Sequence, residues 1–148
     1  MSITKALNAG WIIPVRPRGQ MLEKHTLVIE DQKIRSILPT KDWKRRKSSQ
    51  NIEESDLTSC ALIPGFVNAH THSPMSLLRG IAEDLPLDEW LKNHIWPLED
   101  AFVNKEFVRD GTELSIAEML LSGTTCFNDM YFFGDETARV SIETGIRA

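Results

Sequence analysis

Cysteine, long apolar runs and basic charge are all scarce in this sequence. The two cysteines, Cys60 and Cys126, are too few for a disulfide framework, and their apolar surroundings predict buried free thiols. No stretch approaches the roughly 18 consecutive apolar residues of a membrane span. Residues 1–5 are not followed by the apolar core and cleavage site of a signal peptide. We therefore expect a cytoplasmic protein with no membrane partner.

The charge balance also argues against a nucleic-acid partner. Lys and Arg total 17 against 21 Asp and Glu, a formal charge of -4 over 148 residues. The exception is residues 44–47 (Lys-Arg-Arg-Lys), followed by the polar residues 48–51. This run could bind phosphate, but a basic run between strand-like segments is more often a solvated loop. The 41% hydrophobic and 26% charged residues are typical of a soluble globular protein.

The first 60 residues have the pattern of a small β-sheet module. An apolar stretch lies within Ala6–Val15, and His25–Ile29 and Ile34–Leu38 are two further strand-like segments. Only the short polar segment 30–33 separates the last two, which predicts a hairpin. We therefore place a β module at residues 1–61.

From Ala61 onward, strand-like and helical segments alternate. A strand is predicted over Phe66–His72, followed by a helix over Leu87–Leu98 with Asp88 as a possible N-cap and Pro97 near its end. Asn104 is a suitable N-cap for a longer helix that runs to about Ser122. Gly123 then suits the C′ position that ends such a helix. Apolar residues at three- and four-residue steps predict the inward stripe of that helix: Phe107, Gly111, Leu114, Ala117 and Leu121.

The alternation continues to the last residue. Thr124–Met130 is predicted as a strand, Asp135 as the cap of a helix ending near Gly145, and Ile146–Ala148 as the start of another strand. Strands that alternate with helices indicate a parallel sheet with crossover helices, an α/β fold. Residues 62–148 hold about two strand–helix units, whereas a complete eight-stranded barrel takes about 250 residues. We therefore expect an incomplete barrel and a fragment of a longer chain.

His70 and His72 are the strongest candidates for chemistry. Alternate side chains of a strand share one face, so both imidazoles would project together with Phe66 and Asn68. Two imidazoles at a strand end can hold one divalent metal, and neutral imidazole suits Zn and Fe. Active sites of parallel barrels lie at the carboxyl ends of the strands. The alternative is that both are ordinary core or surface histidines, because His-x-His alone is a weak motif.

The residues around this pair carry a specific resemblance. Residues 63–72 (Ile-Pro-Gly-Phe-Val-Asn-Ala-His-Thr-His) closely resemble the first barrel strand of the amidohydrolase superfamily. Residues 73–91, 93–99 (Asn-His-Ile-Trp-Pro-Leu-Glu) and 129–132 (Asp-Met-Tyr-Phe) are similar to a narrower group. That group contains the methylthioadenosine/S-adenosylhomocysteine deaminases and the triazine hydrolases. The resemblance is strong over residues 61–148 and loose before them.

The resemblance implies roles for three residues. His70 and His72 match the two metal-binding histidines of the first strand, and Glu99 matches the glutamate with which these deaminases hold their nucleoside. It also implies a TIM-like (β/α)8 barrel, here incomplete, preceded by a small N-terminal β-sandwich module. Zn²⁺ is favoured over Fe²⁺, and the acid/base Glu and the remaining His and Asp ligands are expected beyond residue 148. His94 is expected beside the site entrance, His25 on the surface and Asp129 in a structural hydrogen bond.

The function that the resemblance implies is hydrolytic deamination. The enzyme would convert methylthioadenosine or S-adenosylhomocysteine to the inosyl product and ammonia with a metal-activated water, and Glu99 favours such a nucleoside. An s-triazine or guanine-type aminohydrolase or chlorohydrolase is the nearest alternative. A different alternative is a non-catalytic truncated fragment. The family also implies a small-molecule substrate and a homo-oligomer for the full-length enzyme.

Overall fold

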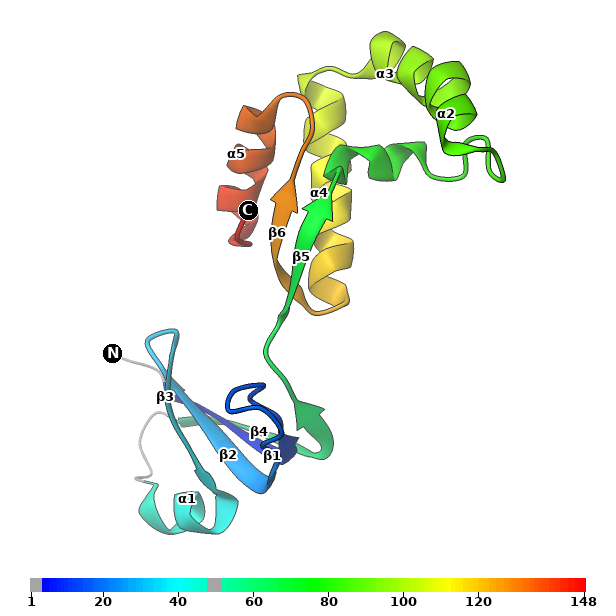
Figure 1. The fold of residues 1–148 in the computed structure, drawn as a ribbon. Coiled ribbons are helices and arrows are strands. Elements are labelled where there is room, and N and C mark those ends of the chain that lie inside the picture. The colour runs from blue at the N-terminus through cyan, green and yellow to red at the C-terminus, as the bar shows by residue number, and fades with distance from the viewer. Residues whose placement is uncertain (1–3, 48–51) are drawn as a thin grey trace. The chain divides into compact units, whose positions relative to one another are not determined.

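The computed structural model describes residues 4–47 and 52–148. The chain forms two compact units, unit 1 (Met1–Pro64) and unit 2 (Gly65–Ala148), and each is described by itself (Figure 1). Within the ranges described, no helix is both long and apolar enough to cross a membrane.

Unit 1 is built on one four-stranded sheet. Its strands are β1 (Thr4–Ile12), β2 (Leu22–Glu30), β3 (Lys33–Pro39) and β4 (Ile52–Leu62), in the order β3-β2-β1-β4. β2 is antiparallel to both β1 and β3, whereas β4 runs parallel to β1. The predicted hairpin is therefore confirmed, and its turn at Asp31 and Gln32 has positive φ at both residues.

Two elements of unit 1 differ from the sequence-based expectation. The basic residues 44–46 form the last turn of a helix, α1 (Thr40–Arg46), so the prediction of a loop is wrong there. Cations at a helix C-terminus complement the helix dipole, which gives this run a structural role. β4 escaped prediction because its first half, residues 53–56 (Glu-Glu-Ser-Asp), has low strand propensity. Residues 48–51, which were predicted to lie in the same loop as residues 44–47, are outside the described residues.

Unit 2 contains two parallel strands with helices after each. The strands are β5 (Phe66–Thr71) and β6 (Thr124–Asp129). Between them lie the 3₁₀ helix η1 (Ser73–Leu78), α2 (Leu87–Trp90), the π-helical turn η2 (Leu91–Ile95), α3 (Trp96–Phe102) and α4 (Lys105–Leu121). α5 (Gly134–Thr144) follows β6, after which Arg147 pairs in parallel with Cys126. The predicted strand–helix alternation is confirmed through α5, whereas the strand predicted at the last residues is represented only by this isolated bridge.

α4 is the central helix of unit 2. Its start and end are as predicted, because the Asn104 side chain accepts a hydrogen bond from Phe107 N (2.9 Å) and Gly123 has a φ of 85°. Of the predicted inward stripe, Gly111 is buried and Phe107 half-buried, but the prediction is wrong for Leu114, Ala117 and Leu121, which are exposed. The buried side of the helix is instead Val108, Gly111, Thr112, Ile116 and Met119.

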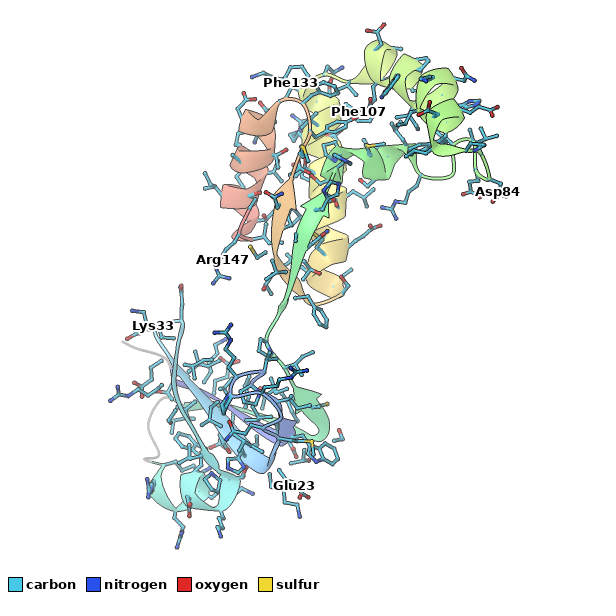
Figure 2. All side chains as sticks on the ribbon, in the orientation of Figure 1. Glu23, Lys33, Asp84, Phe107, Phe133 and Arg147 are labelled. Carbon is cyan, nitrogen blue, oxygen red and sulfur yellow. The ribbon has the colours of Figure 1, made fainter. Side chains whose placement is uncertain are left out.

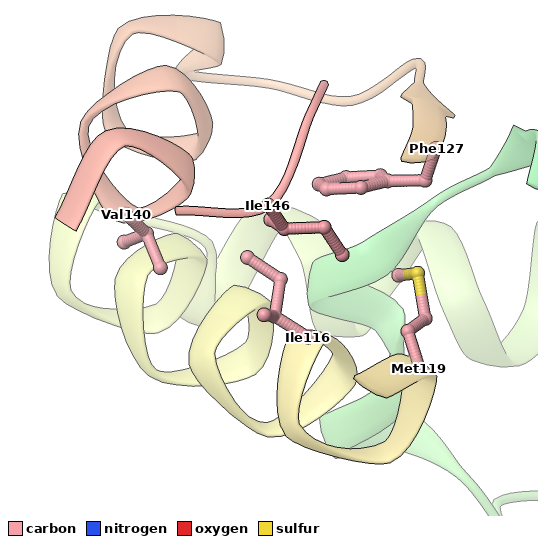
Figure 3. Packing of buried hydrophobic residues seen from close by; sticks show 5 residues of the cluster. All are labelled: Ile116, Met119, Phe127, Val140 and Ile146. Atoms are coloured by element: carbon pink, nitrogen blue, oxygen red, sulfur yellow. The ribbon is translucent and has the colours of Figure 1, made fainter. Parts of the chain in front are cut away.

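The hydrophobic core of unit 2 lies between α4, α5 and β6. It consists of Ile116, Met119, Phe127, Val140 and Ile146 (Figure 3). Phe127 is the largest of these side chains and is only 2% exposed. Nearer the N-terminal end of α4, Gly111 allows close contact with η1, because a Cβ there would lie 2.5 Å from the Pro74 carbonyl oxygen.

The helical segment predicted over Leu87–Leu98 differs from the prediction in its end and its cap. Helical structure extends from Leu87 to Phe102, and Pro86 rather than Asp88 occupies the N-cap of α2. Pro97 lies in the first turn of α3, directly after the π turn, and this break accommodates the missing N–H and the proline ring.

The start of α5 and the exposure of the two cysteines also differ from the prediction. Phe133, in the left-handed conformation, precedes α5 (Figure 2), so Asp135 lies in the first turn and is not its cap. Gly145, with a φ of 78°, ends the helix where predicted. Both cysteines are free thiols, as predicted, but Cys60 is exposed and Cys126 only half-buried, so the prediction that they are buried is wrong.

Candidate functional site

The two predicted metal-binding histidines lie together at the carboxyl end of β5. His70 belongs to the strand, whereas β5 ends at Thr71 and His72 is the next residue. Their ring centroids are 5.0 Å apart with the planes at 83°, and both side chains are exposed. The pairing of the strand ends continues one residue past β6, since Met130 N donates to the carbonyl of Thr71, the last residue of β5 (3.0 Å).

One hydrogen bond determines which nitrogen of His72 is available. Its Nδ1 contacts the carbonyl oxygen of Met130, which can only accept a hydrogen bond. Nδ1 is therefore the protonated nitrogen, and Nε2 of the neutral ring keeps its lone pair. A backbone carbonyl in this position is a common way to orient a metal-binding imidazole.

Both histidines line a pocket of about 680 Å³ in unit 2. Glu99 lies in its wall, so the three residues predicted to form the site line one cavity. The remaining lining is mostly apolar and aromatic and comes from η1, the helical segment after Pro86 and the turn after β6: Met75, Leu87, Trp90, Leu91, Ile95, Trp96, Met130, Tyr131 and Phe132. A mostly apolar cavity with a few polar groups is typical of a small-molecule site.

Glu99 is hydrogen-bonded to a residue for which the sequence predicted no role. The Tyr131 hydroxyl donates to Glu99 Oε1 over 2.7 Å. Burial, followed by the hydrogen bond to Glu99, raises the pKa of Tyr131 well above its ordinary value. The phenol is therefore protonated at neutral pH and acts as the donor. The two residues are 32 positions apart in the chain, so spacing alone could not reveal the pair.

Asp129 has the structural role predicted for it. One of its carboxylate oxygens accepts hydrogen bonds from Ser73 N (2.7 Å) and Ser73 Oγ (2.8 Å). The other accepts from Thr137 Oγ1 (3.4 Å). Asp129 therefore joins the end of β6 to η1, which follows the histidine pair, and to α5.

The other two histidines are outside this cavity. His94 lies in η2 next to Ile95, which lines the pocket, but does not line it itself. His25 belongs to unit 1, where it is half-buried and its Nδ1 lies 2.7 Å from the Glu23 carbonyl oxygen. It is therefore less exposed than the surface position predicted for it.

The donor chemistry of the pocket fits part of a metal site. Within residues 4–47 and 52–148, no three His, Cys, Asp or Glu side chains are grouped closely enough to hold a metal. The histidine pair supplies two nitrogen donors, whereas a catalytic zinc has three protein ligands. The site needs at least one further ligand to reach that number.

The comparison with protein families identifies the class of this chain. Residues 61–148 match the model of the amidohydrolase family. The match covers more than half of the chain, which therefore belongs to the amidohydrolase family and has the mixed α/β fold of that family.

Individual relatives are similar over most of this chain. A 5-methylthioadenosine/S-adenosylhomocysteine deaminase from Saccharophagus degradans is 51% identical over 142 residues, which are 96% of this chain and 31% of the relative. A 5'-deoxyadenosine deaminase from Methanococcus vannielii is 48% identical over 128 residues, 85% of this chain and 29% of the relative.

A solved structure is similar over nearly the whole chain. It is an adenosine deaminase from Xanthomonas campestris with bound zinc, 46% identical, with a TM-score of 0.93 over 99% of this chain and 33% of that one. The chain thus spans about a third of the length of the proteins that it matches.

Proposed function

We propose that these 148 residues are the N-terminal part of a hydrolytic deaminase that acts on adenosine-type thioether nucleosides. Methylthioadenosine or S-adenosylhomocysteine would be converted to the inosyl product and ammonia. The observation that carries the proposal is that His70, His72 and Glu99 line one pocket at the carboxyl ends of β5 and β6. The names of the relatives from Saccharophagus degradans and Methanococcus vannielii support the same substrate class.

The fold proposal follows from the same parallel strands. β5 and β6 are the first two strands of a TIM-like (β/α)8 barrel, whose later strands lie outside this segment. The four-stranded sheet of unit 1 is one part of a composite β-sandwich. The domains are residues 1–61 and 62–148. The fraction of its relatives that the chain spans, about a third, supports a barrel that continues outside this segment.

Each site residue has a distinct role in the proposed reaction. His70 and His72 hold one divalent metal, zinc in preference to iron, with His72 binding through the Nε2 that its hydrogen bond to Met130 leaves free. When bound, such a metal lowers the pKa of water to about 7, so that hydroxide is available at neutral pH. Glu99 accepts hydrogen bonds from the hydroxyls of the nucleoside. The aromatic wall formed by Trp90, Trp96 and Phe132 excludes water from the base.

The remaining components come from beyond residue 148. A general acid/base is required to move a proton onto the leaving ammonia, and we assign it to a glutamate of a later strand. The further His and Asp ligands come from later strands as well. We also propose that the whole protein is a cytoplasmic homo-oligomer, with neither nucleic acid nor a membrane as a partner.

A substrate panel tests this function. The longer protein that contains this segment is loaded with zinc and given methylthioadenosine, S-adenosylhomocysteine, 5'-deoxyadenosine, guanine and an s-triazine. Ammonia release is measured for the nucleosides and guanine, and release of ammonia, amine or chloride for the triazine. Turnover of the adenosine-type nucleosides is expected. Turnover of the triazine or guanine alone would replace the proposed substrate class.

The purified 148-residue chain provides the second arm of the experiment. We expect no deamination from it, because the acid/base and the remaining ligands lie elsewhere. Deamination by this chain alone would overturn the assignment of the missing components. An immediate stop after codon 148 in the gene would instead favour a non-catalytic fragment.

A further inference from the structure

We infer that Tyr131 is a positioning residue that holds the Glu99 carboxylate ready for the ribose hydroxyls of the substrate. The inference rests on the proposed function. It assigns to Tyr131 a role that the histidine motif does not imply. Its basis is the 2.7 Å hydrogen bond from the phenol to Glu99 Oε1 inside the pocket. The other carboxylate oxygen is left to accept hydrogen bonds from the substrate.

The two side chains differ in stiffness, which gives the hydrogen bond its effect. A free glutamate loses the freedom of three rotatable bonds when it is ordered around a ligand. Tyrosine has only two rotatable bonds and a rigid ring. Here the ring of Tyr131 packs edge-on against Phe132, with centroids 5.1 Å apart. Tyr131 therefore orders Glu99 before the substrate arrives, and part of the entropy loss is removed from the binding step.

The place of Tyr131 in the fold fits positioning rather than proton transfer. It follows β6 by two residues, in the turn that also provides the Met130 carbonyl to His72. Its ring centroid is 6.3 Å from that of His72 and its hydroxyl is bonded to Glu99, so the tyrosine lies close to both parts of the site. Its hydroxyl proton is already donated to Glu99, and the raised pKa keeps that proton in place at neutral pH.

The variant Tyr131→Phe tests the inference, because it removes the hydroxyl and keeps the ring. In the zinc-loaded longer protein we expect KM for methylthioadenosine to rise about 10-fold, the low end for the loss of a hydrogen bond to a charged group. We expect kcat to change less than about 2-fold, because the interaction is equally present in the ground and transition states. The Kd of the inosyl product, measured by calorimetry, should rise by the same factor as KM.

A matched control exists in unit 1. Trp43 Nε1 donates to Glu54 Oε1 over 3.3 Å, so Trp43→Phe also removes one hydrogen bond from an aromatic side chain to a glutamate. This variant should leave KM, kcat and the Kd of the product unchanged. A rise in KM for both variants would indicate a general loss of structure and would contradict the inference.

A double-mutant cycle separates positioning from direct contact. In a Glu99→Ala background, Tyr131→Phe should change KM and the product Kd by less than about 2-fold, because there is no carboxylate left to position. An undiminished 10-fold effect in that background would show that Tyr131 contacts the substrate itself, and would overturn the inference. An unchanged KM for Tyr131→Phe in the wild-type background would overturn it as well.

These outcomes are distinct from a failure of the proposed function. If the wild-type protein turns over nucleosides but Tyr131→Phe behaves like it, only the positioning role is wrong. If the wild type neither turns over nor binds any nucleoside of the panel, the proposed function is wrong and the positioning role falls with it.

Discussion

The two units of this chain handle their polar groups in different ways. In unit 1 polar side chains satisfy one another, and Glu54 alone accepts hydrogen bonds from Asn8, Trp43 and Lys47. In unit 2 several polar side chains converge on a cavity, where the two histidines and Glu99 face space that a ligand can occupy. Tyr131, which also lines this cavity, donates its hydroxyl to Glu99.

Strand direction explains the difference. Unit 1 is largely an antiparallel sheet, in which neighbouring strands are joined by short turns and pair locally. β5 and β6 are parallel, so their carboxyl ends lie side by side although His72 and Met130 are 58 positions apart. Parallel pairing thus brings distant segments to one edge, where active sites of such sheets lie. Four changes, in order of decreasing effect, test this contrast between the units.

The largest effect is expected from His72→Ala. Loss of one metal ligand should lower bound zinc and reduce kcat/KM for methylthioadenosine about 1,000-fold or more, since the metal supplies several kcal/mol of transition-state stabilisation. The measurements are metal content by mass spectrometry and ammonia release by the longer protein. The control is His25→Ala, a histidine of unit 1, which should retain both. Full zinc content in His72→Ala would remove the proposed metal site from this strand end.

The second-largest effect is expected from substitutions in the hydrophobic cores of the two units. Phe127→Ala should destabilise unit 2 by about 3–5 kcal/mol, because it leaves a large cavity between α4, α5 and β6. The corresponding change in unit 1, Val28→Ala, removes a smaller buried side chain and should cost about 2 kcal/mol. Hydrogen exchange, followed segment by segment, should increase within the unit that carries the substitution. Equal increases in both units would show that they unfold as one.

Local signals predicted the parts of the fold that depend on neighbouring residues. The cap at Asn104 and the glycine at 123 each require only a few residues, and both are present in the structure. A structural hydrogen bond of Asp129 was also expected, from the family resemblance rather than from a local signal. α1 was missed because basic residues are common in exposed loops and helices alike. The stripe of α4 was misplaced because the leucines of this helix lie on its exposed side, whereas contact with η1 and β6 buries a side that carries Val108, Ile116 and Met119.

The candidate site shows the same limit. The histidine pair was visible because both residues belong to one strand end, but the roles of His70, His72 and Glu99 rest on resemblance and stay predictions. No sequence pattern connects Glu99 with Tyr131, since their contact depends on how the segment from Leu87 to Phe102 returns over the end of β6. The π turn before Pro97 shapes that segment, and it could not be foreseen from periodicity.

A third, smaller effect is expected where α4 touches η1. In Gly111→Ala the new Cβ would lie 2.5 Å from the Pro74 carbonyl oxygen and 2.7 Å from its Cα. Backbone atoms cannot move aside easily, so we expect a loss of about 1–3 kcal/mol despite the better helix propensity of alanine. Gly134→Ala in α5 is the control, because a Cβ there meets nothing within 4 Å. It should be neutral or stabilising in urea unfolding, and equal stability of the two variants would contradict the close contact.

The smallest effect is expected from Glu54, whose carboxylate accepts hydrogen bonds from other side chains of unit 1. The hydrogen bond from Lys47, opposed by burial, holds the pKa of Glu54 below its ordinary value of 4.5. A depressed pKa in the folded state contributes stability above the ordinary value, and this contribution is lost as the pH falls through the folded pKa. Glu54→Gln should therefore make the urea midpoint fall less steeply below about pH 4.5. The corresponding change in the free energy of unfolding should be less than about 1 kcal/mol, because the Lys47–Glu54 pair is partly exposed. Glu53→Gln, next to it and paired with Lys5 at 3.3 Å on the surface, should keep the wild-type acid profile. If the two variants gave the same profile, Glu54 would behave as an ordinary surface charge. The contrast between unit 1, whose polar side chains bond to one another, and unit 2, whose polar side chains face a ligand cavity, would then lose its clearest example.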